Sequence, residues 1–316
     1  MIICDTHCDT LYMRALQPQK TPCVTMEAMK KGGMSLQTCT LYAGNAGMAG
    51  HPYDKAMAEY RAFEHLRDTE GWTRVDSPLE AEDGKVKILL SVEGGEIFEG
   101  KVERVREFYG YGVRMAALTW NNENEIGHSA KSGSKEGIKP VGWEILRAMA
   151  ELKMAADTSH LNEAGFWDLM KITKKPFIAS HSNSRALCDV PRNLTDDQLR
   201  AIRDVNGVVG LNAFNLFIDD DPANQTVQRL AEHAAHMIDV MGIDHVGCGF
   251  DFFEFIDNPD TMGTMTDTGS PCTKGLANAS EIPNIFACFE KMGMSKEDME
   301  KIARLNFQRV VKDAIG

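Results

Sequence analysis

Two residues near the start of the chain have side chains suited to binding a metal ion. His7 and Asp9 lie in the segment Asp5-Thr6-His7-Cys8-Asp9, which follows the apolar run Met1-Ile2-Ile3-Cys4. That run predicts a buried strand, and side chains two residues apart on a strand point to the same face. An imidazole and a carboxylate that converge in this way are potential metal ligands. Taken alone, such a pair is more typical of an ordinary polar strand end, so the prediction depends on the rest of the chain.

Four further candidates for metal binding fall where predicted strands end: Glu93, His160, His181 and Asp251. Each has an ordinary interpretation on its own, as a turn residue, a loop residue or a helix cap. Their shared position at strand ends is harder to explain in that way. Six candidate ligands also exceed the roughly four that one metal ion takes. We therefore predict two metal ions, with Glu93 as the natural bridge between them.

The elements that must position these residues alternate along the chain. Amphipathic spacing predicts helices in most of the gaps between strands, and Thr195 and Gln198 form a predicted capping box at the start of one of them. This alternation predicts an α/β fold, a (β/α)8 TIM-like barrel that forms a single domain over residues 1–316, with the metal site at its C-terminal rim. The eight predicted strands cover residues 1–4, 35–42, 86–92, 113–120, 154–159, 176–180, 207–212 and 245–251.

The composition indicates which binding partners and which cellular location to expect. There are 46 Asp and Glu residues against 34 Lys and Arg residues, and the net charge is −12. This charge argues against nucleic acid or an anionic membrane surface as the main partner. No apolar run is long enough for a transmembrane helix, and we see no signal peptide before the first strand. Several of the eight cysteines lie in strand-like runs and none forms a CxxC pair, so we expect reduced thiols and a cytoplasmic protein.

Two polar residues outside the candidate ligands are interpreted as possible substrate contacts. Arg192 follows the sixth predicted strand, where its guanidinium group is suited to binding a carboxylate; a surface salt bridge is the alternative. His128 lies in the long polar loop over residues 121–139, which is a candidate active-site loop. His245 begins the eighth predicted strand and is therefore expected at the opposite rim. The histidines expected in surface or packing positions are His51, His65, His233 and His236.

Together these segments resemble the membrane (renal) dipeptidase family, zinc peptidases within the amidohydrolase-like barrels. No single segment is specific, but the set follows the family's order and spans nearly the whole chain. The matching segments are Asp5-Thr6-His7-Cys8-Asp9, Val92-Glu93-Gly94-Gly95, Asp157-Thr158-Ser159-His160, Ser180-His181-Ser182, Arg192-Asn193-Leu194-Thr195-Asp196-Asp197 and Gly249-Phe250-Asp251-Phe252.

The resemblance implies a binuclear zinc site. His7 and Asp9 would bind one ion, His160 and His181 the other, and Glu93 would bridge the two. Imidazole and carboxylate ligands also admit Mn, Co or Fe, so the identity of the two divalent ions stays open at this point.

The resemblance also implies how a dipeptide would bind and react. Arg192 would bind the substrate's C-terminal carboxylate, and Asp251 would face its amino end and take part in proton transfer. Family members often tolerate a D residue at the C-terminal position of the dipeptide. The predicted chemistry is attack on the peptide carbonyl by a metal-bridging hydroxide, with Asp251 and Glu93 as the catalytic carboxylates.

The chain departs from the family pattern at two positions that would contact substrate. Better-known members carry a His after the fourth strand that contacts the substrate's oxyanion, and here Trp120 occupies that position. Asn121 or His128 would then be the candidates to replace it. A Tyr expected after the seventh strand is replaced by Phe214. The animal enzymes are secreted and lipid-anchored. Because we recognise neither a signal peptide nor an anchor segment in this sequence, we expect a bacterial cytoplasmic relative. The resemblance is also compatible with a homodimer.

The predicted function is a metallodipeptidase, a binuclear zinc hydrolase acting on a small dipeptide substrate. Trp120 motivates an alternative, in which another metal-dependent amidohydrolase acts on N-acyl amino acids, cyclic amides or lactones. A third possibility is a barrel that binds metal or peptide without catalysis.

Overall fold

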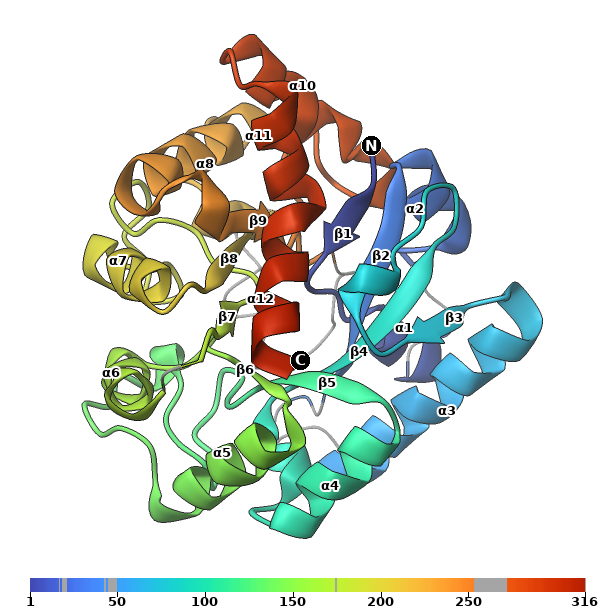
Figure 1. Cartoon of the computed structure of the whole chain (residues 1–316), viewed down its shortest axis with the longest axis vertical. Helices are drawn as coiled ribbons and strands as arrows, with labels where there is room; N and C mark the ends of the chain where they lie inside the picture. The colour runs from blue at the N-terminus through green and yellow to red at the C-terminus, as the bar shows by residue number, and fades with distance from the viewer. Residues whose placement is uncertain are drawn as a thin grey trace.

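The computed structural model describes residues 1–16, 18, 22–42, 44, 50–173, 175–252 and 272–315. Within these ranges, nine parallel strands form one sheet in the order β2-β1-β9-β8-β7-β6-β5-β4-β3, and a further pairing of β2 with β4 closes eight of them into a barrel (Figure 1). The predicted (β/α)8 TIM-like barrel is therefore confirmed. The strands are β1 (Ile3–Asp5), β2 (Met34–Tyr42), β3 (Thr73–Val75), β4 (Lys87–Glu93), β5 (Val113–Ala117), β6 (Ala155–Asp157), β7 (Ile178–Ala179), β8 (Val208–Leu211) and β9 (Val246–Cys248).

Helices surround the barrel and occupy the connections between strands (Figure 1). The predicted capping box at Thr195 and Gln198 is confirmed at the start of α7. The α-helices are α1 (Thr10–Leu16), α2 (Met26–Lys31), α3 (Pro52–Glu70), α4 (Val102–Gly110), α5 (Pro140–Leu152), α6 (Glu163–Ile172), α7 (Asp196–Asp204), α8 (Val227–Met241), α10 (Pro283–Lys291), α11 (Lys296–Glu300) and α12 (Asn306–Ile315). No helix among the described residues combines the length and apolarity needed to cross a bilayer.

Strand β3 lies outside the closed barrel and was not predicted. It pairs with the first three residues of β4, and β5 pairs with the remainder of β4 from Leu90 onward. The two strands thus share one edge of β4. With only three residues, of which Thr73 and Arg74 are exposed, β3 has too little apolar periodicity to be recognised in the sequence.

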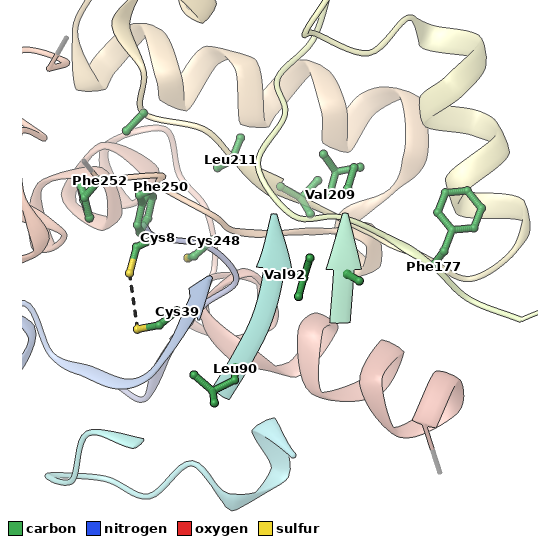
Figure 2. Close-up of a cluster of buried hydrophobic side chains, with 14 of the residues drawn as sticks. Cys8, Cys39, Leu90, Val92, Phe177, Val209, Leu211, Cys248, Phe250 and Phe252 are labelled. Atoms are coloured by element: carbon green, nitrogen blue, oxygen red, sulfur yellow. Dashed lines mark hydrogen bonds between the residues drawn. The ribbon is translucent and has the colours of Figure 1, made fainter. Parts of the chain in front are cut away.

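Side chains along β4 alternate between the barrel interior and the layer between the strands and the helices. Leu90 and Val92 belong to the apolar layer between the strands and the helices (Figure 2). Leu89 instead packs inside the barrel, in a separate apolar cluster. Because side chains alternate along a strand, Ser91 and Glu93 also face the interior, progressively nearer the C-terminal rim.

The N-terminal end of the barrel is closed by the last helix, α12, which crosses in front of the strands in Figure 1. Phe307, Val310 and Val311 of α12 pack with the apolar side chains that begin the strands. Those strand residues are Cys4, Leu36, Leu89, Met115, Ala155, Ile178 and Val208. The lower part of the barrel is therefore a dry apolar core.

Several boundaries differ from the predictions. The strand predicted over residues 113–120 ends at Ala117, and the one predicted over 245–251 ends at Cys248. Trp120 and Asp251 thus lie three residues beyond their strands, in the turns that follow. The helical segment that closes the chain is divided into α11, a π-helical turn over residues 301–305 and α12.

A close approach of three strands above the apolar core requires glycine. A Cβ added to Gly249 would lie 1.8 Å from the carbonyl oxygen of Ser180 and 2.6 Å from the Thr6 hydroxyl, and one added to Gly210 would lie 2.1 Å from the same carbonyl. The contacts with the Ser180 carbonyl oxygen are with backbone, so a rotamer change cannot relieve them.

We therefore expect Gly249→Ala to lower the free energy of unfolding by about 1–3 kcal/mol, the usual cost of overpacking. Urea denaturation measures this loss. The matched control is Gly110→Ala in α4, where an added Cβ meets nothing within 4 Å; it should be neutral or stabilising by up to about 1 kcal/mol. Equal stability of both variants would contradict this account of the barrel interior.

Candidate metal centre

Three imidazoles converge on one carboxylate oxygen at the C-terminal rim. Glu93 Oε1 lies 3.4 Å from His7 Nε2, 3.0 Å from His160 Nε2 and 3.3 Å from His181 Nε2. All four residues are buried. The structure thus brings together side chains from β4 and from the turns after β1, β6 and β7, as the sequence predicted.

Two further carboxylates complete the cluster on the side of His7. Its Nε2 lies 3.6 Å from Asp9 Oδ2 and 3.5 Å from Asp251 Oδ1. Burial lowers the pKa of His7, but the charges of Glu93, Asp9 and Asp251 outweigh this effect and raise the pKa to about 10. The buried site therefore favours a positive charge strongly.

Two of these side chains depend on unusual backbone conformations. His160 and Asp251 have φ angles of 70° and 57°, in the left-handed region that L residues rarely adopt. The strained turns aim both side chains into the barrel mouth. Asn212 Nδ2 donates a hydrogen bond to Asp251 Oδ2 at 3.0 Å, and burial raises the pKa of Asp251 to about 6.

Hydrogen bonds behind the imidazoles fix their tautomers. The Ser180 hydroxyl donates to the Asp157 carboxylate, so at 2.7 Å it accepts from Nδ1 of His181. Asn121 Oδ1 likewise lies 3.1 Å from His160 Nδ1 and accepts a hydrogen bond from it. Both rings then present an unprotonated Nε2 to the centre of the site, which is the form that binds a metal. Burial holds the pKa of both imidazoles well below the usual range.

Two aspartates that support the ligands were missed in the sequence. Asp5 Oδ1 accepts from the backbone N–H of His7 at 3.0 Å and of Phe250 at 3.3 Å. Asp157 makes the same kind of contacts: its Oδ1 accepts hydrogen bonds from the backbone N–H of Ser159 at 2.9 Å and of Ser180 at 3.0 Å. The signal available was an Asp that ends an apolar strand shortly before a predicted ligand.

Thr40 is a third supporting residue that sequence reasoning missed. Its hydroxyl donates to the Asp9 carboxylate, which fixes the orientation of that side chain. The only hint in the sequence was its position in a long predicted strand, where it alternates with apolar residues.

The residues present fit divalent metal ions. His7 Nε2 and Glu93 Oε2 are buried and have no hydrogen-bond partner within the described chain. Two sets of donors have all their ligand atoms within 4.8 Å of one another, His7 with Glu93 and His181, and His7 with Asp9 and Asp251. Imidazole nitrogens and carboxylate oxygens are the donors that zinc and related ions use.

Arg192 is buried beside this centre, with 8% of its surface exposed. Its Nη2 donates to the carbonyl oxygen of His181 at 3.2 Å, and its guanidinium carbon lies 5.3 Å from the centre of the Phe217 ring. Nε has no partner within the described chain. Burial lowers the pKa of Arg192 to about 10, so it remains a cation at neutral pH.

Aromatic side chains border the centre. Trp120 is buried with its ring 6.1 Å from that of His160 and 4.9 Å from that of Tyr42. Phe214 packs against Phe217 with ring centres 4.7 Å apart. The predicted substrate-binding role of Trp120, Phe214 and Asn121 stays a prediction.

The other histidines lie apart from the ligands. His128 lies between two carboxylates of its own loop, at 3.4 Å from Glu123 and 3.6 Å from Glu136. His245 bonds the carbonyl oxygen of Gly207 at the opposite end of the barrel, as predicted. His233 is a buried packing residue that bonds Ser184 N and Ile218 O.

Comparison with known sequences decides the family. The model of the membrane dipeptidase family, peptidase family M19, matches residues 1–315. The chain belongs to this family.

A protein encoded in the pqqA 5′ region of Klebsiella pneumoniae is 33% identical over 241 residues, which cover 73% of this chain and 83% of that protein. An uncharacterised dipeptidase of Schizosaccharomyces pombe is 31% identical over 72% of this chain, but the match spans only 53% of that protein. The chain thus spans about half the length of this fungal relative.

Solved structures support the fold of this membrane dipeptidase family member. A metallopeptidase from Rhodobacter sphaeroides, liganded with a phosphinate mimic of the dipeptide L-Ala-D-Ala, superimposes with a TM-score of 0.85 at 24% identity over 99% of each chain. An amidohydrolase from Pseudomonas aeruginosa has the same TM-score and identity, over 100% of this chain and 97% of that one. Family membership and the convergent ligands together support a metal-dependent dipeptidase.

The hydrogen bond behind His181 provides a test of the metal centre. We expect Ser180→Ala to weaken metal binding by roughly 10–100-fold, because the imidazole loses the acceptor that fixes its tautomer. Competition with a chromophoric chelator measures the affinity. Ser280→Ala, in a turn away from the barrel mouth, serves as the control. Unchanged affinity in Ser180→Ala would show that the hydroxyl does not orient the ligand.

Proposed function

We propose that this protein hydrolyses dipeptides, and that Arg192 selects them by their C-terminal carboxylate. The observation that carries the proposal is a buried guanidinium group beside the metal ligands, for which the described residues provide no ion pair. A buried cation without an ion-pair partner is costly. A substrate carboxylate would satisfy it with charge-assisted hydrogen bonds.

The proposed metal content is two divalent ions, zinc being the first candidate. His7 and Asp9 would hold one ion, His160 and His181 the other, and Glu93 would bridge them, which agrees with the central position of its Oε1. Bound there, such ions would supply Lewis acidity that polarises the peptide carbonyl and lowers the pKa of water.

The protein's own groups would place the peptide bond and move its protons. Arg192 would bind the terminal carboxylate and so restrict the length of substrate beyond the scissile bond. Asp251, with a pKa of about 6, can accept a proton from the attacking water and return it to the leaving amine near neutral pH. Glu93 would take part by binding both ions and keeping their positions relative to each other constant.

The mimic bound to the Rhodobacter sphaeroides structure supports dipeptides, including those with a C-terminal D residue, as the first substrates to test. Trp120 supports a second candidate. It packs with Tyr12, Met13 and Tyr42 in an apolar cluster beside His160, and such a surface would also suit the acyl group of an N-acyl amino acid. The cytoplasmic location, the single-domain organisation over residues 1–316 and a homodimer stay predictions.

The first test is hydrolysis of a panel of L,L- and L,D-dipeptides beside N-acyl amino acids. We expect cleavage of dipeptides by zinc-loaded protein, and a loss of at least about 10²-fold after chelation or in His181→Ala, because the ligands act together. Amino acid release measured by chromatography is the readout. Metal-loaded protein that cleaves only N-acyl amino acids would overturn the dipeptidase proposal.

The role of Arg192 is tested with dipeptides and their C-terminal amides. Arg192→Ala should raise KM for dipeptides by roughly 10–100-fold, since a charged hydrogen bond contributes about 1.5–3 kcal/mol, and should abolish the preference over the amides. Arg200→Ala is a matched control, because Arg200 lies on α7, which follows the same loop, and pairs with Asp197 at the surface. An unchanged KM in Arg192→Ala would contradict this role.

A further inference from the structure

Tyr42, the last residue of β2, directs its side chain toward the metal centre. It is paired with Glu93 in the register of β2 and β4, and residues paired across parallel strands point to the same face of the sheet. Thr40, two residues earlier on the same face, bonds Asp9. The Tyr42 side chain therefore projects into the barrel mouth, one layer above the residue that holds a ligand.

The ring and the backbone of Tyr42 are both held in place. The ring lies edge-on to Tyr12 and to Trp120, at centroid distances of 5.3 Å and 4.9 Å. The backbone N–H donates to Glu59 Oε2 of α3 at 2.8 Å, and this carboxyl is fully buried. The position of the phenol is thus determined by three other elements of the fold.

The Tyr42 hydroxyl is buried and has no hydrogen-bond partner within the described chain. An unsatisfied buried hydroxyl costs roughly 1–3 kcal/mol, and in a native site it calls for an explanation such as a ligand. A phenol ordinarily ionises only near pH 10, so at neutral pH the hydroxyl carries its proton and is available as a donor.

Several other polar groups at the mouth are already engaged. The Thr40, Ser180 and Asn212 side chains donate to carboxylates of the site, and Asn121 accepts from His160. The Thr38 and Ser91 hydroxyls also have no partner among the described residues, but by strand alternation they lie one layer deeper, below Thr40 and Glu93.

We infer that Tyr42 is a catalytic residue whose hydroxyl donates a hydrogen bond to the carbonyl oxygen of the scissile bond as negative charge develops on it. The proton stays on the phenol throughout, so no group transfer is involved. The inference rests on the proposed dipeptidase function and adds a donor that neither the ligands nor Arg192 and Asp251 supply. A single donor of this kind typically contributes 10²–10³-fold in kcat.

The test is Tyr42→Phe, which removes the hydroxyl and keeps the ring that packs against Trp120. In metal-loaded enzyme we expect kcat for a dipeptide to fall about 10²-fold with KM changed by less than about threefold. The affinity for a phosphinate dipeptide mimic, whose tetrahedral centre carries the negative oxygen, should fall in parallel. Metal content and Tm should not fall, because the hydroxyl makes no hydrogen bond to any described residue. Tyr60→Phe is the control: it removes the hydroxyl of a tyrosine on α3 whose ring packs against that of Tyr111.

Each other outcome decides against the inference. Wild-type kcat and mimic affinity in Tyr42→Phe would overturn it and leave the proposed function intact. A change in KM alone would assign the hydroxyl to ground-state binding, and a loss of metal or Tm would assign it to structure. Metal-loaded wild-type protein that cleaves no dipeptide would overturn the proposed function itself, and the inference with it.

Discussion

The concentration of negative charge at the barrel mouth is the constraint on which the rest of the site depends. Glu93, Asp9 and Asp251 are close together and shielded from water, so they require positive charge in their midst. That requirement explains the high pKa of His7 and makes the position suitable for divalent cations. It also accounts for a buried Arg192, because its cost is partly offset by the acidic neighbours that oppose the lowering of its pKa.

The two ends of the barrel have different roles: the N-terminal end stabilises the fold, and the C-terminal rim carries the candidate metal ligands. The lower end is an apolar core closed by α12, and it holds the strands in register. That rigidity supports the left-handed turns at His160 and Asp251, whose strain an isolated loop would release. The same strand alternation that packs Leu90 and Val92 outward brings Glu93 inward, so the fold and the site have a common origin.

The sequence predicted the barrel and every proposed ligand because ligands at strand ends carry a strong signal: position relative to an apolar run and chemical type. It failed where function depends on contacts between distant segments. The hydrogen bonds from Thr40 to Asp9 and from Asn212 to Asp251 join residues that are 31 and 39 positions apart in the sequence. The unpartnered hydroxyl of Tyr42 was equally invisible, since a Tyr ending a strand is ordinary until its surroundings are known.

The closure of the lower barrel by α12 has a consequence for turnover. Among the described residues, the interior offers no passage from the ligands to that end, because apolar side chains fill it. For the described part of the chain, substrate would therefore enter and products leave through the C-terminal rim of the barrel.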